Sequence, residues 1–581
     1  MTPTLSPTDR PHDISQPLAR LSDDERLKVA SDQLRGTIMR SLGDRLSGAV
    51  SDPDTKLLKF QGIYQQDDRD LRDERRRQKL EPAFQFMIRV RLPGGVCTPA
   101  QWLKLDELAR THGGNTLRLT TRQTFQFHWV LKQNLKPTLQ GLHEVLLDTI
   151  AACGDDSRGV MSAVNPHLSA LHAQVVDLAR RASNQAIPKM RAYHEIWYGE
   201  ERIASSEPEE PFYGRSYMPR KFKIGFAIPP SNDIDVHAQD LGFIAIADEG
   251  GLKGFNVAIG GGMGRTDQAS ETYPRLADVI GFVTPEQVLA TCEAVMAVQR
   301  DHGDRKNRAH ARFKYTIDDR GLAWTQAEIE RRLGFTLQAP RPYAFDSNGD
   351  TLGWQQGDDG RHHVTLFIQN GRLANHPGLL WMDGMRAIAS VHEGEFRLTP
   401  NQNLTIANIG DDKRAEIERL LDAYGFMAPS KTSAMRLNSM ACVAFPTCGL
   451  AMAESERYMP DLLTRIEAIL ETHGLTDEPI TIRMSGCPNG CSRPYIAEIG
   501  LTGRAPSKYN LYLGGGFHGQ RLNRMVLENI GEPAILEMLD KTLGHYARDR
   551  LPGEHFGDFA IRAGHVREVL EGRDFNSAPT P

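Results

Sequence analysis

The chain has 581 residues, of which 40% are hydrophobic and 25% charged, and its formal net charge is −5. Such a composition is typical of a globular protein with room for several cores, and it indicates neither a nucleic-acid nor a membrane-surface partner. No stretch approaches the ~20 consecutive apolar residues of a membrane helix, and the N-terminus lacks the apolar core of a secretory signal. Because seven cysteines are too few for a disulfide scaffold, we expect a protein of the reducing cytoplasm.

Taken in chain order, the predicted elements form two similar series. Each series has a strand-like run, then a helix-like segment, then a motif that begins Arg-Leu-Thr. The first series is FMIRVRL at 86–92, QWLKLDELARTHG at 101–113 and RLTTRQTF at 118–125. The second series is VTLFI at 364–368, WMDGMRAIASVHEG at 381–394 and RLTPNQNL at 397–404.

A second motif also occurs twice, once after each series. FNVAIGGG at 255–262 returns as YNLYLGGG at 509–516, a short β-rich run that ends in three glycines. Two motifs in the same order predict a duplicated two-module unit. Shared strand-and-turn chemistry without common origin is the alternative. We expect an α+β, or mixed α/β, fold with two copies about a pseudo-twofold axis and a large ligand at their join.

Four cysteines are paired in the second copy. Cys442 and Cys448 form C-x5-C, and Cys487 and Cys491 form C-x3-C. Four thiolates are what a [4Fe–4S] cluster needs. A structural zinc site remains an alternative, although zinc sites favour C-x2-C turns, and four unrelated buried thiols are a third reading. The remaining cysteines are scattered, and we predict buried structural thiols at Cys97, Cys153 and Cys292.

The segment GGGFHG at 514–519 formally fits a dinucleotide-binding motif. We reject that reading because the same triplet in the first copy continues to Arg265 where the third glycine should stand. Three glycines can also mark a close approach of backbone to a flat cofactor. If NADPH is the electron source, a separate protein is expected to oxidise it.

Basic residues recur in pairs within strand-like segments. Strand alternation places the members of a pair on one face of a sheet. A solvated face explains any single pair, whereas three pairs favour a shared anionic ligand. The pairs are Arg89 with Arg91, Arg118 with Arg122, and Lys221 with Lys223. A further basic and acidic run at 67–77 is predicted to be a self-paired surface helix.

Several of these stretches resemble one known family. They are YQQDDRDLRDERRRQKLEP, RVRLPGGV, RLTTRQTFQFH, YMPRKFKIGFAIPPSNDID, NSMACVAFPTC, GCPNGCSR and KYNLYLGGG. They resemble the siroheme sulfite and nitrite reductases, and within them the hemoprotein (β) components of the assimilatory NADPH-dependent kind. The resemblance runs from about residue 20 to about residue 570, and the C-x5-C…C-x3-C pattern is specific to the family.

The resemblance implies duplicated ferredoxin-like and siroheme-binding modules, a siroheme packed against a [4Fe–4S] cluster, and six-electron reduction of sulfite to sulfide. It implies that Cys491 joins the cluster to the siroheme iron. The residues expected to act on sulfite are Arg89, Arg158, Lys221, Lys223 and, near the distal pocket, His128. Those expected at the siroheme are Arg118, Arg122, Gln126 and Asn489, with help from Arg305, Arg308 and Arg312. Two small departures from the family pattern are Ser492 and Gly159.

The resemblance also implies partners and boundaries. We expect electrons from a flavoprotein (FAD/FMN) that oxidises NADPH, and a place in sulfate assimilation and cysteine biosynthesis. The expected parts are a docking extension at 1–80, small modules at 81–150 and 346–427, and large modules at 151–345 and 428–581. GCPNGC and PRKFK are expected in corresponding parts of the two copies. Alternatives are a ferredoxin-dependent siroheme nitrite reductase and a zinc-stabilised protein with a basic anion groove.

Overall fold

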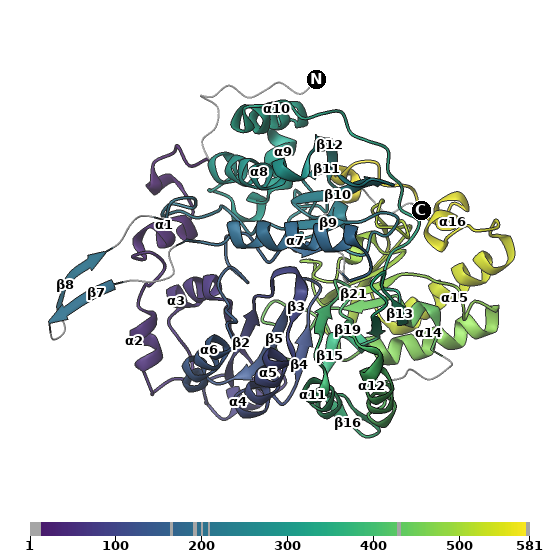
Figure 1. The fold of residues 1–581 in the computed structure, drawn as a ribbon, viewed down its shortest axis with the longest axis horizontal. Helices are drawn as coiled ribbons and strands as arrows, with labels where there is room; N and C mark the ends of the chain where they lie inside the picture. The colour runs from purple at the N-terminus through teal and green to yellow at the C-terminus, as the bar shows by residue number, and fades with distance from the viewer. Residues whose placement is uncertain are drawn as a thin grey trace.

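The computed structural model describes residues 13–162, 167–189, 194–198, 201–206, 210–426 and 432–576. Within these ranges the chain forms four five-stranded sheets and two short two-stranded ones. Helices and strands are mixed throughout (Figure 1), so the α+β fold class is confirmed. None of the helices in these ranges is long and apolar enough to cross a membrane.

The first small module is a sheet with strand order β1-β2-β5-β4-β15, together with two helices. Helix α5 begins where the sequence signals it, because Thr98 and Gln101 form a capping box and Pro99 takes the first helical position. The elements are β1 (Ile63–Asp67), β2 (Phe84–Val90), α5 (Pro99–Thr111), β4 (Leu117–Leu119), β5 (Phe125–Val130) and α6 (Leu135–Glu144).

The second small module repeats this plan with strand order β13-β14-β19-β18-β3. Its predicted strand and helix are found as β14 and α11. The elements are β13 (Gly353–Gln356), β14 (His362–Leu366), α11 (Trp381–Val391), β18 (Glu395–Leu398), β19 (Leu404–Ile409) and α12 (Asp411–Ala423). A two-stranded sheet of β16 (Asn375–His376) and β17 (Leu379–Leu380) precedes α11.

The two small modules exchange one strand each. Strand β3 (Val96–Cys97), from the first series, pairs with β18 in the second sheet. Strand β15 (Arg372–Leu373), from the second series, pairs with β4 in the first. This reciprocal exchange is what a pseudo-twofold axis between two copies requires.

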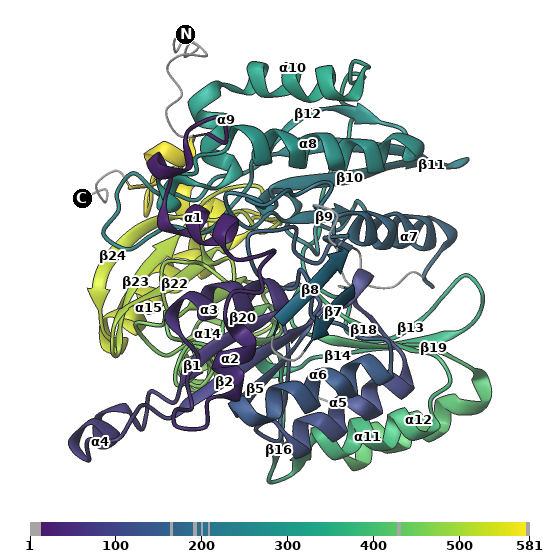
Figure 2. The same cartoon turned by 90° about the vertical axis from the view of Figure 1, so that its left-hand side faces the viewer.

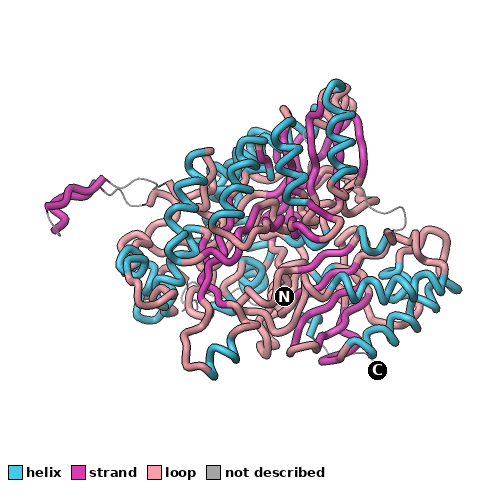
Figure 3. Tube along the Cα trace, turned by 90° about the horizontal axis from the view of Figure 1, so that it is seen from below, coloured by secondary structure: helices cyan, strands magenta, loops and turns pink. Residues whose placement is uncertain are grey.

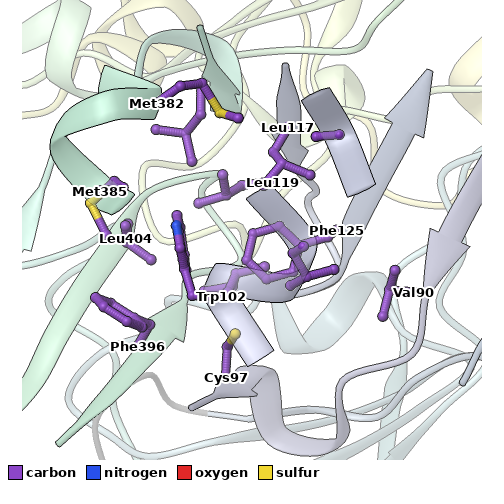
Figure 4. Close-up of a cluster of buried hydrophobic side chains, with 14 of the residues drawn as sticks. Val90, Cys97, Trp102, Leu117, Leu119, Phe125, Met382, Met385, Phe396 and Leu404 are labelled. Carbon is purple, nitrogen blue, oxygen red and sulfur yellow. The ribbon is translucent and has the colours of Figure 1, made fainter. Parts of the chain in front are cut away.

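A single hydrophobic core lies between the small modules. Trp102 on α5 packs edge-on against Phe125 at a ring-centroid distance of 5.3 Å and against Phe396 of the other module at 4.8 Å (Figure 4). The same cluster includes Leu119 and Leu404, one from each copy. Residues of both modules belong to this one cluster, so neither small module has a complete core alone. Truncating a buried Phe or Trp to Ala costs about 3–5 kcal/mol, so each module depends on the other for much of its stability.

The first large module follows the first small one. Its sheet has the order β12-β11-β10-β9-β6, with α7 and α8 packed together on it. The elements are β6 (Met161–Ser162), α7 (Ala170–Gln185), β9 (Ile224–Ala227), β10 (Leu241–Asp248), β11 (Gly251–Ile259), β12 (Asp278–Val283), α8 (Val288–His302), α9 (Phe313–Arg320) and α10 (Leu322–Leu333). A hairpin of β7 (His194–Tyr198) and β8 (Glu201–Ser206) projects from the body (Figure 3).

The second large module has a sheet in the order β20-β21-β22-β23-β24, with α14 and α15 packed together on it. The elements are α13 (Ala434–Leu437), β20 (Ser439–Ala441), α14 (Met459–His473), β21 (Ile482–Ser485), β22 (Ile499–Ala505), β23 (Lys508–Leu513), β24 (Arg524–Ile530), α15 (Glu532–Asp549) and α16 (Phe556–Arg562).

Equivalent strands of the two large modules pair in the same register. Ile224 of β9 pairs with Leu241 of β10, and Ile482 of β21 pairs with Ile499 of β22, both in parallel pairing. Counted from these pairs, IPPSND at 228–233 corresponds to GCPNGC at 486–491. The expectation that GCPNGC and PRKFK take corresponding places is therefore wrong. PRKFK precedes its strand, whereas GCPNGC follows the equivalent strand.

The glycine triplets have a packing role in both copies. A Cβ atom on Gly261 would lie 2.2 Å from the His237 carbonyl oxygen, and one on Gly515 would lie 2.2 Å from that of Ala497. No side chain fits at either place, so the backbone of each large module packs on itself there. In the second copy the triplet leads through a turn to β24 and not into a helix, which excludes the dinucleotide motif.

The chain before the first sheet carries three helices, α1 (Asp23–Ala30), α2 (Ile38–Gly43) and α3 (Asp52–Leu57). Strand β1, which we expected within the N-terminal extension, is a full member of the first sheet. Helix α4 (Arg72–Arg77) stands between β1 and β2 and projects from the body (Figure 2). It is the predicted surface helix, with Arg77 paired to Glu74 at 2.6 Å.

Candidate active site

Two loops of the second large module bring the four paired cysteines together. Cys442 follows β20 and Cys448 lies further along the same loop, while Cys487 and Cys491 follow β21. The four thiols influence one another electrostatically, and burial together with this mutual influence raises the pKa of Cys442 to about 12. The cysteines that were predicted to be isolated thiols are buried.

The spacing of the four thiols bears on the zinc alternative. A tetrahedral zinc site needs sulfur atoms ~3.8 Å apart, because each Zn–S bond is about 2.3 Å long. In the part of the chain that the structure describes, no three His, Cys, Asp or Glu side chains lie close enough to share one metal ion. Four cysteines that interact electrostatically within one site supply the four thiolates that a cubane cluster needs, one for each iron.

Exposure distinguishes Cys491 from the other three cysteines. Its side chain is exposed, whereas Cys487 is buried and Cys442 and Cys448 are half-buried. Nearby N–H groups reach the other sulfur atoms, with Gly486 N 3.2 Å from Cys442 Sγ and Asn489 Nδ2 3.5 Å from Cys487 Sγ. Such N–H groups stabilise thiolates that bind a cluster. Cys491 thus combines membership of the cluster site with an open side.

Five basic side chains, which we call the cation cluster, lie close to one another, and one of them, Lys221, interacts with Cys491. Electrostatic interactions connect them to one another and, through Lys221, to the Cys491 thiol. They come from the first small module and from the first large one. The cation cluster consists of Arg89, Arg122, Arg158, Lys221 and Lys223.

The two lysines of the cation cluster directly precede β9. Both are half-buried, with the buried Phe222 between them, as strand alternation predicts. Burial, followed by the charges of Arg220 and Arg312, lowers the pKa of Lys221 well below its usual value. Burial, followed by the charges of Arg122 and Lys221, does the same for Lys223. Two ammonium groups with lowered pKa can release protons more readily than a free lysine.

Arg158 and Arg89 are anchored to the same loop. Arg158 donates through Nη1 to the Ala152 carbonyl at 3.1 Å and through Nη2 to the Gly154 carbonyl at 3.0 Å. Arg89 Nη1 lies 2.9 Å from Cys153 Sγ. A half-turn of the Gln126 amide places its oxygen 2.6 Å from Arg89 Nη2. Both guanidinium groups are therefore fixed in direction, and Arg158 also interacts electrostatically with Tyr64, Cys153 and Asp156.

Arg122 stands in the turn between β4 and β5. Its Nη2 donates to the Gly159 carbonyl at 2.6 Å and its Nη1 to Gln239 Oε1 at 2.9 Å, whereas its Nε is buried without a partner among the described residues. Burial, followed by the charges of Arg158 and Arg493, lowers the pKa of Arg122 to about 9. An anion beside this guanidinium would accept a hydrogen bond from Nε and would offset the repulsion between the neighbouring positive charges.

The equivalent turn in the second copy is filled by the chain itself. Asn401, which corresponds to Arg122, and Asn403 donate to Asp350 at 3.1 Å and 2.8 Å. Thr399 also donates to this buried carboxyl group. Burial raises the pKa of Asp350, which lies in the linker between the two copies. Among the described residues, the first of the two duplicated turns retains an unpartnered donor, Arg122 Nε, for a ligand.

Arg118 and His128 have surroundings that differ from those of the cation cluster. Arg118 is buried and paired to Glu456 at 2.6 Å, and it also donates to the Ala441 carbonyl at 2.8 Å. His128 is 1% exposed and neither ring nitrogen has a partner within the described ranges. Burial, followed by the charges of Arg372 and Arg118, lowers the pKa of His128 well below its usual value. The histidine is therefore neutral at physiological pH.

The basic run after α8 divides into two parts. Arg305 pairs with Glu25 of α1 at 2.5 Å, and Arg308 binds Asp155 through two nitrogen atoms at 2.8 and 2.9 Å. Because Arg308 also pairs with Asp24 of α1 at 3.4 Å, both arginines join this N-terminal helix to the body. Arg312 lies closer to the cation cluster, since its partner Asp240 also accepts from the Lys223 backbone at 2.9 Å.

Two contacts near the candidate site were not foreseen from the sequence. Lys314 is fully buried and donates to the Gly262 and Gly264 carbonyls at 3.1 and 2.8 Å, beneath the first glycine triplet. Arg69, which sequence reasoning assigned to the surface helix, donates to the carbonyls of Cys448 and Ala451. Nothing in the local sequence signals either contact, because each joins segments that are far apart in the chain.

These observations fit a large anionic cofactor beside a cluster. Unpartnered buried Nε atoms occur on Arg122, Arg158 and Arg312. Among the described residues these buried and half-buried cations have few carboxylate partners, which favours anionic groups from outside the chain. The duplicated fold and this site define an iron–sulfur oxidoreductase with a second, polyanionic cofactor.

Comparisons with known proteins identify the family. A model described as "Nitrite and sulphite reductase 4Fe-4S domain" matches residues 179–337 and 433–572. A model described as "Nitrite/Sulfite reductase ferredoxin-like half domain" matches residues 77–145 and 354–424. The chain belongs to the nitrite and sulphite reductase family, and its cofactors are siroheme and a [4Fe–4S] cluster.

Individual relatives cover nearly the whole chain. A protein of Bordetella petrii named "Sulfite reductase [NADPH] hemoprotein beta-component" is 75% identical and covers 98% of each chain. One of the same name from Nitrobacter winogradskyi is 71% identical over 98% of this chain and 99% of its own. The solved structure of the Mycobacterium tuberculosis NirA protein superposes with a TM-score of 0.74 at 25% identity, covering 94% of this chain and 97% of that one.

Proposed function

We propose that this protein reduces sulfite to sulfide by six electrons, at a siroheme that shares the Cys491 thiolate with the [4Fe–4S] cluster. The exposure of Cys491 carries the proposal, because the other three cysteines of the set are buried or half-buried. A thiolate that faces both a cluster site and a cation cluster can connect one cofactor to the other. In the sulfite reductases named among the relatives, the substrate is a small oxyanion, which suits such a site.

The siroheme supplies an iron atom that binds sulfite and passes it electrons. Its carboxylates would contact donors without a full set of partners, above all Arg122, with Gln126 and Asn489 also close to the cysteine loop and cation cluster. Arg118 contributes differently. Because Glu456 already holds it, we propose that it supports the Cys442 loop and touches the cofactor at most through its remaining donors.

Arg89 and Arg158 are proposed to bind the sulfite oxygens. Their anchoring to the segment 152–154 keeps both guanidinium groups in place before substrate arrives. Fixed cations of this kind stabilise negative charge that develops while S–O bonds break. His128 is buried and neutral, so we propose that it shapes the distal side and does not deliver protons.

Lys221 and Lys223 are proposed to supply protons. Each oxygen that leaves sulfite as water needs two protons, and an ammonium group with a lowered pKa is a suitable general acid. The two lysines stand on the same side of their strand segment and interact with each other, and Lys221 also interacts with the Cys491 thiol. Their ammonium groups can therefore serve one bound anion in succession.

Electrons are proposed to come from a separate flavoprotein that oxidises NADPH. The described chain offers an approach to the cluster at the loop after Cys448, where Leu450 is 68% exposed. Arg69 holds this loop, and α4, with Arg76 and Arg77 about three-quarters exposed, follows directly in the chain. We propose that α4 and this loop dock an acidic face of the flavoprotein.

The proposal also covers the module boundaries, the pathway and the cellular location of the enzyme. We propose that the modules divide at residues 81–150, 151–345, 346–427 and 428–581, with β1 added to the first of them by its pairing with β2, and that the enzyme serves cysteine biosynthesis in the cytoplasm. A direct test is the purified chain supplied with reduced viologen. Its kcat/KM for sulfite should exceed that for nitrite, with strong visible absorption and acid-labile sulfide. A higher kcat/KM for nitrite would favour a nitrite reductase instead, and turnover with NADPH alone would refute the separate flavoprotein.

A further inference from the structure

Two residues at equivalent places in the two large modules form a buried ion pair. Counted from the paired strands, Asp235 and Arg493 correspond, and each directly precedes a short 3-10 turn. Both have left-handed backbone, with φ of 51° and 56°, and they are 0% and 4% exposed. Arg493 Nε donates to Asp235 Oδ2. Because equivalent residues can meet only where the copies meet, this pair marks the pseudo-twofold axis.

The same guanidinium also contacts both small modules. Arg493 Nη1 donates to the Thr121 carbonyl at 3.2 Å, and Nη2 donates to the Pro400 carbonyl at 3.1 Å. Thr121 and Pro400 are themselves equivalent, since they hold the fourth position of RLTT and RLTP. One side chain of the second large module therefore binds the other three modules.

This side chain is tied closely to Cys491. Arg493 is two residues beyond Cys491, and its backbone N–H donates to the Gly490 carbonyl at 3.0 Å. Thr121, whose carbonyl accepts from Arg493, donates through its hydroxyl to the Cys491 carbonyl at 3.2 Å. The backbone on both sides of the exposed cysteine is thus held by groups that depend on the Arg493 guanidinium.

The backbone conformation at Arg493 needs this support. A residue other than glycine with left-handed backbone costs roughly 1–2 kcal/mol, and it persists only where the surroundings fix it. Three side-chain hydrogen bonds, one of them to the buried carboxylate of Asp235, supply that restraint. Without them the turn can relax, and a thiolate two residues away would leave the narrow range of positions, about 0.5 Å wide, in which a shared ligand works.

We infer that Arg493 is a positioning residue that sets the Cys491 thiolate between cluster and siroheme only when all four modules are joined. The inference rests on the proposed sharing of Cys491. It assigns Arg493 no contact with sulfite or with either cofactor. Its effect is carried by the backbone from residue 493 to residue 491 and by Thr121.

Three variants test the inference. Arg493→Met removes the guanidinium, and Arg493→Lys keeps a charge opposite Asp235 but cannot reach the carboxylate and both carbonyls together. Arg483→Met is the matched control, because Arg483 binds the same Asp235 at 2.7 Å and is equally buried, yet no bond joins its side chain to Thr121 or Pro400 in the described structure. For each variant we would measure iron and siroheme content, melting temperature and low-temperature Mössbauer spectra.

The decisive readout is magnetic coupling, since cluster irons sense the siroheme spin only through a shared ligand. We expect wild type and Arg483→Met to show the coupling, even if Arg483→Met melts at a lower temperature. Arg493→Lys is expected to bind iron and siroheme in wild-type amounts and to lose the coupling, as is any Arg493→Met that retains cofactors. Full coupling in Arg493→Lys would overturn the inference, and so would equal loss in Arg483→Met. A wild type that contains both cofactors without coupling would instead refute the shared thiolate.

Discussion

Glu456 connects Arg118 of the first small module to the loop that carries Cys442. Its carboxylate accepts from Arg118 at 2.6 Å and from Arg372 at 2.6 Å, while its backbone N–H donates to the Cys442 carbonyl at 3.0 Å. Two guanidinium groups on the exchanged pair of strands β4 and β15 thus share one carboxylate of the cluster module. The cluster loop is fixed to the small modules through this largely buried ion triad.

Replacing Glu456 with Gln should therefore destabilise the protein strongly. The buried Arg118 and the half-buried Arg372 would lose their counter-charge, which costs about 3–5 kcal/mol for a broken buried pair. Glu454→Gln is a suitable control two residues away, because Glu454 pairs with the half-exposed Arg457 and such a pair contributes about 1 kcal/mol or less. Chemical denaturation of both variants would measure the difference. Equal losses of stability would contradict the role given to Glu456.

Lys221→Met and Lys223→Met should each lower kcat for sulfite by about 10²-fold or more, the usual contribution of a general acid. Both lysines have a lowered pKa, so their protonated fraction falls as pH rises through that lowered value. Wild-type activity should fall as the protonated fraction falls. The residual activity of the double variant should not show this decrease at alkaline pH. Lys253→Met, at an exposed pair with Asp248, should behave as wild type. Near-normal turnover in both single variants would remove the lysines from the mechanism.

Reversing the charges of α4 should weaken electron supply by the flavoprotein and leave electron supply by reduced viologen unchanged. The double variant Arg76→Glu with Arg77→Glu should raise the KM for the flavoprotein about tenfold or more at low salt, since exposed charges mainly steer association. Turnover with reduced viologen should not change. Arg331→Glu on α10, at the far end of the molecule from α4 (Figure 2), controls for charge alone. A KM for the flavoprotein that stays at the wild-type value would exclude α4 from the docking surface.

Glu498 should make stability depend on pH. Its carboxyl group is fully buried, it accepts from Thr481 N at 2.8 Å and Gly557 N at 2.9 Å, and burial raises its pKa to about 7. The folded protein then binds more protons than the unfolded chain between pH 4.5 and about 7, so this group's contribution is complete at low pH and is lost as pH rises. Between low and high pH, the contribution of Glu498 to the free energy of unfolding changes by roughly 3 kcal/mol.

Melting temperatures of wild type and Glu498→Gln between pH 5 and pH 8 would check this. The amide cannot ionise, so the variant should lose less stability than wild type as the pH rises. Comparing the two slopes cancels the other titrating groups. Parallel slopes would show that Glu498 titrates normally.

Much of this architecture could be predicted from the sequence because duplication leaves repeated motifs. RLTTRQTF and RLTPNQNL fall in equivalent turns, and the predicted helices at 101–113 and 381–394 are α5 and α11. The exchange of β3 and β15 could not be foreseen, since strands of two residues carry no periodic signal. The correspondence of GCPNGC with IPPSND also needed the strand register, because the two segments share only a proline.

The candidate site was predictable in its residue types and less so in its contacts. Spacing identified four cysteines as a set, yet nothing in C-x5-C and C-x3-C indicates that Cys491 is the exposed member. The paired lysines lie on one side of their segment, as alternation predicts. Arg118 also belongs to a predicted basic pair, but its guanidinium group is already paired with Glu456, a partner 338 positions away in the chain. Ion pairs of such long range depend on the whole fold and leave no local pattern.

The strand exchange between the small modules also constrains biosynthesis. The first sheet is finished only by β15, which ends at Leu373, more than two hundred residues after β5. A nascent chain on the ribosome therefore exposes the edge of β4 while the whole first large module is made. Unpaired edges of this kind invite pairing with other chains. We expect the N-terminal half, if released alone, to aggregate, and to become soluble when the C-terminal half is supplied in the same cell.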